Sequence, residues 1–295
     1  MPTPNNHRSL VFRGRRVERD RALVMAIINR TPDSFYDRGA TFADIAAREA
    51  VERVVAEGAD IVDIGGVRAG AEGGEVTAEE EIRRVVPIVA WARDRFPELV
   101  ISVDTWRHEV GREVCEAGAD LLNDTWAGTD PRLVEVAAEF GTGYVCSHTG
   151  GLPPRTDPYR PHYPDVVAAV IEETTRSAEN AVRLGVPREG ILIDPTLDFG
   201  KNTWHSLELL RHTARLVATG LPVLIALSNK DFIGETLDAP VAQRGPGTLA
   251  ATAMAARDGA AVFRAHDVRG TRDVLEMVAT ILGDRRPAKV LRGLA

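Results

Sequence analysis

The sequence predicts an α/β protein that folds as a single (β/α)8 TIM barrel, and three observations lead to this prediction. Eight short apolar runs each end in a polar residue, and a helix-like segment follows each run. Runs such as residues 223–227 are continuously hydrophobic, as expected for parallel strands covered on both faces. The 295 residues match the size of one barrel, and no linker or shift of composition divides them.

The predicted strands comprise residues 23–28, 59–62, 99–103, 119–122, 144–147, 191–193, 223–227 and 261–263. The polar residues that follow them are, in order, Asn29; Asp63; Asp104; Asn123 and Asp124; His148; Asp194; Ser228 and Lys230; Arg264 and His266. Because barrel enzymes carry their sites at the carboxyl ends of the strands, this pattern predicts a site at that face.

Helical periodicity predicts the segments between the strands. The expected helices comprise residues 43–57, 77–95, 107–117, 131–140, 165–184, 204–219, 249–258 and 269–282. Gly58 is expected to end the first helix, and Thr77 with Glu80 resembles a capping box for the second. Residues 149–164 contain five prolines and are expected to form a long loop above the fifth strand. Residues 1–20 are expected to be an N-terminal extension, and residues 21–295 the barrel.

The composition excludes several classes of protein. A net charge of −7 argues against broad binding to nucleic acid or anionic membranes. No apolar run approaches the roughly 18 residues of a membrane span, and the first residues do not resemble a signal peptide, so we expect a cytoplasmic protein. Cys115 and Cys146 have no zinc-site spacing and are expected to be small core residues.

Asp104, Asn123, Asp194 and Lys230 should converge above the barrel if the strand assignments are correct. Carboxylates and an amide oxygen accept hydrogen bonds from ring N–H and amino groups, and an ammonium donates to a ring carbonyl or nitrogen. This set suits a flat nitrogen heterocycle. The alternative for each Asp or Asn alone is that it caps the following helix.

Arg264 and His266 are two residues apart, so both can face one side of the last strand. A guanidinium and an imidazole together suit an anion, especially a phosphate, at the position where barrel enzymes often hold one. The alternative is that each is a solvated or capping residue.

Seven motifs in order closely resemble those of dihydropteroate synthase. They are NRTPDSFYDRG (29–39), DIGG (63–66), SVDT (102–105), LNDT (122–125), DPTLDFGK (194–201), SNKDFIG (228–234) and RAHD (264–267). Members of that family join a dihydropterin pyrophosphate to p-aminobenzoate in folate biosynthesis and release pyrophosphate.

The resemblance implies roles for the residues that match these motifs. The pterin would be held by Asp104, Asn123, Asp194 and Lys230, and the pyrophosphate by Asn29, Arg264 and His266 with Mg²⁺ near Asn29. Ser228 would also bind substrate. Lys230, Asp33 and Arg68 would take part in catalysis, with Asp33 in a loop that closes over the site. The resemblance also implies p-aminobenzoate or sulfonamide-like ligands, and a homodimer formed through the closing helices.

The chain departs from the family pattern in two loops. The family reads Gly-Gly-Glu-Ser-Thr-Arg-Pro-Gly after the second strand, whereas this chain reads Gly-Gly-Val-Arg-Ala-Gly at residues 65–70. The simplest alignment keeps the arginine as Arg68 and loses the hydroxyl donors. Asn229 replaces a family arginine that flanks the pterin, and Asp231 replaces a serine. Each lost charged hydrogen bond is worth roughly 1.5–3 kcal/mol, so we expect a diverged paralogue with weak or no synthase activity.

Three other readings stay open from the sequence. The chain could be an active synthase in which residues 70–74, Arg30 or Arg38 compensate for the altered loop. It could be a non-catalytic pterin-binding or regulatory module. It could also resemble folate-dependent methyltransferase domains, although Arg264 and His266 count against this because methyl transfer needs no pyrophosphate site.

Overall fold

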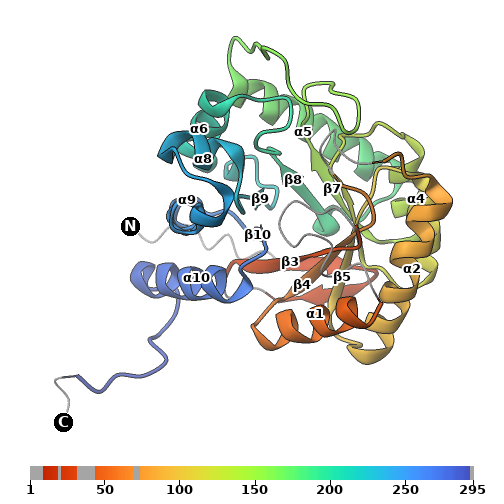
Figure 1. The fold of residues 1–295 in the computed structure, drawn as a ribbon, viewed down its shortest axis with the longest axis horizontal. Helices are drawn as coiled ribbons and strands as arrows, with labels where there is room; N and C mark the ends of the chain where they lie inside the picture. Colours follow the sequence, from red (N-terminus) through yellow and green to blue (C-terminus); the bar gives the residue numbers. More distant parts are fainter. Residues whose placement is uncertain (1–8, 19–20, 32–43, 69–73, 293–295) are drawn as a thin grey trace.

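The computed structural model describes residues 9–18, 21–31, 44–68 and 74–292 and shows a (β/α)8 barrel (Figure 1). In these residues eight parallel strands form one sheet in the order β8-β7-β6-β5-β4-β3-β10-β9. A parallel bridge between Ile193 and Val223 brings β8 and β9 together. The strands are β3 (Leu23–Asn29), β4 (Ile61–Gly65), β5 (Val100–Asp104), β6 (Leu121–Asp124), β7 (Gly143–Ser147), β8 (Ile191–Asp194), β9 (Leu224–Ala226) and β10 (Val262–Ala265).

Helices surround these strands in Figure 1, and most begin and end within a few residues of the predicted positions. They are α1 (Asp44–Ala56), α2 (Ala78–Arg95), α3 (His108–Glu116), α4 (Arg132–Phe140), α5 (Val166–Leu184), α6 (Thr203–Arg211), α7 (Thr213–Val217), α8 (Asp231–Leu237), α9 (Gly245–Arg257) and α10 (Val268–Leu282). The fold class is therefore confirmed. Two details were not predicted: the expected helix over 204–219 is divided at His212, and α8 is additional.

Alternation along the strands determines which side chains enter the barrel. In β3, Val24 and Ala26 pack outward in the large cluster against the helices, whereas Leu23 and Met25 point inward. Inward-pointing apolar residues from all eight strands fill the lower part of the barrel. Because this layer is apolar, polar inward positions occur only near the carboxyl ends of the strands.

A hairpin of β1 (Leu10–Phe12) and β2 (Arg15–Val17) closes the lower end of the barrel. Leu10 and Phe12 are fully buried against the inward-pointing apolar layer. A Cβ atom at Gly143 would lie 2.4 Å from Cδ1 of Phe12, so only glycine leaves room for this ring. Part of the segment expected to be an extension therefore belongs to the base of the barrel core.

The helix ends and the cysteines agree with simple local rules. Thr77 Oγ1 accepts a hydrogen bond from the Glu80 backbone N–H at 3.2 Å, but the Glu80 carboxylate bonds to Arg84, so only half of the expected capping box forms. Gly58 ends α1 with a φ of +99°. Cys115 and Cys146 are free and buried, which confirms their expected place in the core. Among the described residues, no helix is long and apolar enough to span a bilayer.

Candidate functional site

A cavity of about 720 Å³ lies at the carboxyl ends of the strands and gathers the described candidate residues. Its lining includes Asn29, Arg68, Asp104, Asn123, Asp194, Ser228, Lys230, Arg264 and His266. These side chains come from strands or strand-end loops that are distant in sequence. Asp33, the remaining candidate, lies outside the described residues. The structure thus brings the described candidates to one cavity, as the strand-end pattern requires.

Asp63 organises the inner end of this cavity, which we define by Asp104, Asn123, Asp194 and Arg264. Its carboxylate is fully buried and accepts hydrogen bonds from Asn123 Nδ2 at 3.1 Å and Arg264 Nε at 2.6 Å. A second nitrogen of Arg264, Nη2, donates to Asp104 Oδ2 at 2.6 Å. Two carboxylates therefore fix the plane of the guanidinium. The sequence pattern marks Asp63 as a strand-end residue but gives it no role; the signal is its inward position within β4.

Burial raises the pKa of two carboxyl groups at the inner end. It raises that of Asp104 to about 6, although Arg264 opposes the rise. It also raises that of Asp194 to about 6, against the opposing effects of the Thr196 N–H, which donates to Oδ1 at 2.7 Å, and of Lys230. At neutral pH both groups are mostly ionised and act as hydrogen-bond acceptors.

Lys230 presents its ammonium to the cavity beside an aromatic ring. Its Nζ lies 4.5 Å from the centre of the Phe199 ring, within the range of a cation–π interaction. Burial lowers the pKa of Lys230, while Asp198 and Asp194 raise it in opposition. Within the described part of the chain no acceptor lies within hydrogen-bond distance of Nζ, so the ammonium can donate to a ligand.

The last strand and the turn after β9 are joined through Ser228, whose hydroxyl accepts a hydrogen bond from the His266 backbone N–H at 3.1 Å. Burial lowers the pKa of His266 to about 3, and Arg264 and Lys230 lower it further. The imidazole is therefore neutral at physiological pH. It would contact an anion as a hydrogen-bond donor, while Arg264 and Lys230 supply the positive charge.

Asp231 begins α8, and its carboxylate forms a salt bridge with Arg244 at 2.8 Å. Arg244 also donates to the carbonyl oxygen of Asn229 at 2.8 Å. Asn229 itself has a φ of +55°, a left-handed conformation that asparagine tolerates better than most residues. Asp231 is thus partly neutralised by Arg244, and Asp198 has a larger effect than Asp231 on the pKa of Lys230.

The outer end of the cavity, which we define by Asp157, Arg160, Asp198, Asp231 and Glu235, lies beyond the strand ends. Asp157 and Arg160 belong to the loop after β7, Asp198 to the loop after β8, and the other two to α8. The loop after β7 contains no helix or strand over 149–164, which confirms the long loop expected there. The sequence pattern does not single out the outer end, because loop residues carry no periodicity.

Lys201 links the loop after β7 to the loop after β8. Its buried ammonium donates to the carbonyl oxygens of His148 at 2.7 Å, Phe199 at 2.8 Å and Thr196 at 3.2 Å. Burial lowers the pKa of Lys201 to about 7, and Asp194 opposes this shift. Because three carbonyl groups occupy its three N–H groups, Lys201 positions the loops that line the cavity.

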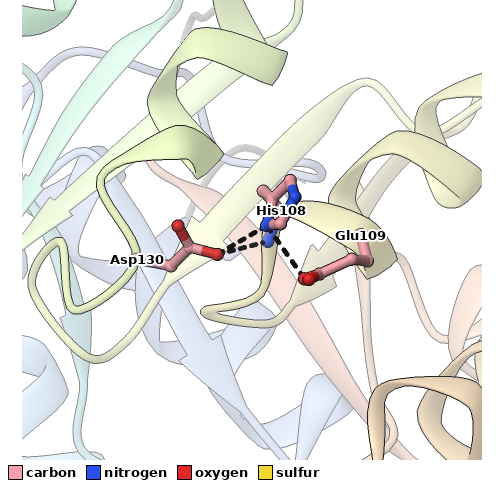
Figure 2. Close-up of side chains that lie close together, drawn as sticks. All are labelled: His108, Glu109 and Asp130. Atoms are coloured by element: carbon pink, nitrogen blue, oxygen red, sulfur yellow. Dashed lines mark hydrogen bonds and ion pairs between the residues drawn. The ribbon is translucent and has the colours of Figure 1, made fainter.

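Two other polar groups lie away from the cavity lining. Asp124 accepts a hydrogen bond from the Tyr144 hydroxyl at 2.5 Å on the outer side of the barrel. His108 contacts two carboxylates, with Nδ1 2.7 Å from Asp130 and 2.9 Å from Glu109 (Figure 2). Asp130 also accepts backbone N–H groups at the start of α3 and from Arg132 in α4, each at 3.1 Å. Helix capping therefore accounts for this cluster.

The comparisons with known proteins agree with the geometry. A family model described as "Pterin binding enzyme" matches residues 25–266. An "Inactive dihydropteroate synthase 2" from Mycobacterium tuberculosis is 60% identical over 286 residues, which cover 96% of this chain and 90% of that protein. The chain belongs to the dihydropteroate synthase family. The dihydropteroate synthase of Escherichia coli is 37% identical over 259 residues, or 88% and 91% of the two chains.

The solved structure of a dihydropteroate synthase has the same barrel fold as this chain. The Yersinia pestis dihydropteroate synthase, crystallised in a sulfonamide drug complex, has a TM-score of 0.88 and 33% identity, over 94% of this chain and all of that one. Because identity is higher to the proteins named inactive than to the Escherichia coli synthase, this chain is a diverged paralogue within the family. In the altered loop after β4, Val67 and Arg68 line the cavity, and residues 69–73 lie outside the described residues.

Proposed function

We propose that this chain binds a pterin at the inner end of the cavity and has weak or no dihydropteroate synthase activity. The observation that carries this proposal is that Asp104, Asn123, Asp194 and Lys230 line one cavity at the strand ends. Asn123 donates its Nδ2 to Asp63, which leaves its amide oxygen as an acceptor. Three acceptors and one ammonium donor complement the amino, ring N–H and carbonyl groups of a pterin.

Arg264 supports the flat ring and the anion next to it. Two of its nitrogens are held by Asp63 and Asp104, so the guanidinium plane is fixed before a ligand arrives. A planar guanidinium stacks on aromatic faces and also binds phosphate oxygens. His266 and Asn29 line the same cavity and would contact the pyrophosphate.

Mg²⁺ fits this arrangement if it arrives bound to the pyrophosphate of the substrate. Mg²⁺ usually keeps several waters and binds through one or two protein oxygens together with substrate phosphates. Asn29 lines the cavity, and its side chain carries an amide oxygen of the type that Mg²⁺ binds. We therefore propose that Mg²⁺ enters with the pyrophosphate, next to Asn29, and neutralises part of its charge.

Reduced synthase activity follows from the changes in two loops at the carboxyl ends of the strands. The second-strand loop lacks the hydroxyl donors of the family, and Asn229 replaces an arginine that flanks the pterin there. Losing these contacts weakens both the binding and the alignment of the reacting groups, and misalignment alone lowers rates strongly. The name of the Mycobacterium tuberculosis relative, an inactive synthase, supports the same conclusion for this chain.

An active synthase that condenses the dihydropterin pyrophosphate with p-aminobenzoate is the second candidate. Two observations favour it: Arg68 lines the cavity, and Arg244 partly neutralises Asp231. In that case p-aminobenzoate and sulfonamide-like molecules would enter beside Lys230. We further propose that the protein is cytoplasmic and forms a homodimer. Met254, Met277 and Ile281, which α9 and α10 leave exposed, support the dimer.

Calorimetric titration with 6-hydroxymethyl-7,8-dihydropterin pyrophosphate and Mg²⁺ tests the binding. We expect the wild-type protein to bind the pterin. Asn123→Ala should lose about tenfold to a hundredfold in affinity, because it removes an amide that bonds to the Asp63 carboxylate and accepts from the pterin. Glu172→Gln, on the exposed face of α5, is the control and should bind normally. A wild-type protein that takes up no pterin would refute the proposal.

A further inference from the structure

Carboxylates dominate the outer end of the cavity. Asp157, Asp198, Asp231 and Glu235 all line it, and the guanidinium that accompanies them there belongs to Arg160. Arg160 also lies 5.5 Å from the centre of the Tyr159 ring, so part of its charge faces an aromatic ring. Arg68 contributes a second guanidinium from the β4 side of the cavity. In the part of the chain that the structure describes, carboxylates therefore outnumber guanidinium groups at the outer end.

Asp198 already accepts the first backbone N–H of α8. Its Oδ2 accepts the backbone N–H of Asp231 at 2.7 Å, and its Oδ1 accepts the hydroxyl of Ser206 at 3.1 Å. Asp198 has a φ of +71°, a conformation that few side chains adopt without a local hydrogen bond to support it. The protein thus supplies its own carboxylate to this N–H group.

The nearby cations do not restore a site for an anion. Arg244 is held by Asp231 and by the carbonyl oxygens of Asn229 and Ala239, at 2.8, 2.8 and 3.2 Å, and it is not part of the cavity lining. The Glu235 carboxylate accepts a hydrogen bond from the Thr203 hydroxyl, which leaves its charge in place. Among the described residues, a ligand carboxylate at the outer end would therefore meet more carboxylates than cations, which is unfavourable at short range.

We propose that the outer end selects the second ligand by charge: it accepts an aromatic amine whose far end is positively charged or neutral, and it disfavours a carboxylate. This inference rests on the proposed function, in which the pterin fills the inner end and leaves the outer end for the second ligand. Lys230 interacts electrostatically with Asp194 of the inner end and with Asp198 of the outer end. A second ligand beside Lys230 with its amino group toward the pterin would therefore turn its far end toward the outer end. Selection against p-aminobenzoate then adds to the loss of synthase activity.

Three ligands of nearly equal shape test the selection: p-aminobenzoate, p-aminobenzamide and p-aminobenzamidine, which are negative, neutral and positive at pH 7.5. Each is titrated by calorimetry into protein saturated with 6-hydroxymethylpterin and pyrophosphate. We expect affinity to rise in that order, with at least tenfold between the benzoate and the amidine. Equal affinities, or tighter binding of the benzoate, would overturn the inference.

Charge-neutral variants identify the residues responsible. Asp198→Asn keeps an acceptor and a residue that tolerates positive φ, and Glu235→Gln keeps the shape of the side chain. The double variant Asp198→Asn/Glu235→Gln should lose most of the preference for the amidine, whereas the control Glu172→Gln on α5 should keep it. An unchanged preference in the double variant would contradict the role of the two carboxylates. Failure of the pterin itself to bind would refute the proposed function as well, whereas pterin binding with preference for the benzoate would refute only this inference.

Discussion

Asp104 and Asp194 show at the scale of single residues how the cavity is adapted to a ligand. Each is a buried carboxyl group whose pKa is raised to about 6, so ionisation at neutral pH is less favourable than in water. A bound pterin would donate hydrogen bonds to these groups and offset that penalty. Active sites often retain such unfavourable groups, and their replacement then increases stability while it removes function.

Asp194→Asn should therefore stabilise the ligand-free protein at pH 7.5. The pKa of Asp194 is raised in the folded state, so its contribution to stability is complete below pH 3.8 and is lost as the pH rises through about 6. Removing the charge should raise the free energy of unfolding at pH 7.5 by about 1–3 kcal/mol, since one pKa unit corresponds to about 1.4 kcal/mol. Urea unfolding at pH 7.5 and pH 4.5 measures this.

The gain should shrink at pH 4.5, where the wild-type carboxyl group is already mostly protonated. The same variant should bind the pterin more weakly at pH 7.5, because an acceptor becomes a donor on one side. Equal destabilisation at both pH values would contradict the assignment of Asp194 as a buried group held for a ligand.

The positions of most candidate residues could be predicted at this scale, because each follows an apolar run and a two-residue alternation points it inward. The roles of Asp63 and Asp198 could not be predicted from the sequence pattern. Asp63 lies one step deeper in its strand, and its importance depends on contacts with Asn123 and Arg264 from distant parts of the chain. Asp198 acts through a turn with positive φ, which no periodicity reveals.

The β1–β2 hairpin shows the same principle at the scale of elements. Its residues are too few to be recognised by pattern, yet Phe12 is fully buried beneath the barrel. Docking requires glycine at the start of β7 and just before β8. A Cβ atom at Gly143 would lie 2.4 Å from Phe12, and one at Gly190 would lie 2.7 Å from the Val11 carbonyl oxygen. The hairpin is therefore a fixed part of the core.

Phe12→Ala should lower the free energy of unfolding by about 3–5 kcal/mol, the range measured when a buried phenylalanine is truncated. Chemical denaturation followed by circular dichroism measures the change. Arg16→Ala, on the exposed face of the same hairpin, should change it by less than about 0.5 kcal/mol. Similar small effects for both variants would show that the hairpin does not stabilise the barrel.

The helices could be predicted closely where they are long, as in α2 and α5, because an apolar stripe and end signals agree. The short α8 could not. It depends on Arg244, which packs so closely that a Cβ at Gly234 would lie 2.3 Å from its Nε. This contact joins positions ten residues apart and has no signature in local sequence.

At the scale of the whole molecule, stability and chemistry occupy opposite ends of the barrel. The apolar lower layer and the hairpin hold the fold together, and the loops at the carboxyl ends carry the residues that differ from the family. Barrels tolerate such loop changes because the strands beneath them are unaffected. A paralogue can therefore keep the residues of the inner end while the sequences of the loops above the strands change.

Exposed apolar residues on α9 and α10 predict a homodimer in solution. Met277 and Ile281 are 61% and 70% exposed, and Met254 on the neighbouring helix is 47% exposed. Light scattering should give twice the chain mass of 32.0 kDa. The double variant Met277→Asp/Ile281→Asp should give a monomer, because charged groups are unfavourable at the core of an interface.

Ile45→Asp is the matched control, since Ile45 is 73% exposed on α1, and this variant should remain dimeric. A wild-type protein with the mass of one chain would contradict the dimer. So would a double variant that keeps the wild-type mass.

Pyrophosphate release distinguishes a weak or inactive synthase from an active one. The wild-type protein, saturated with 6-hydroxymethyl-7,8-dihydropterin pyrophosphate, Mg²⁺ and p-aminobenzoate, is compared at equal concentration with the Escherichia coli dihydropteroate synthase. Loss of two or more charged contacts and of alignment predicts release at least about a hundredfold slower. Release at a rate similar to that of the Escherichia coli enzyme would show that this chain is an active synthase.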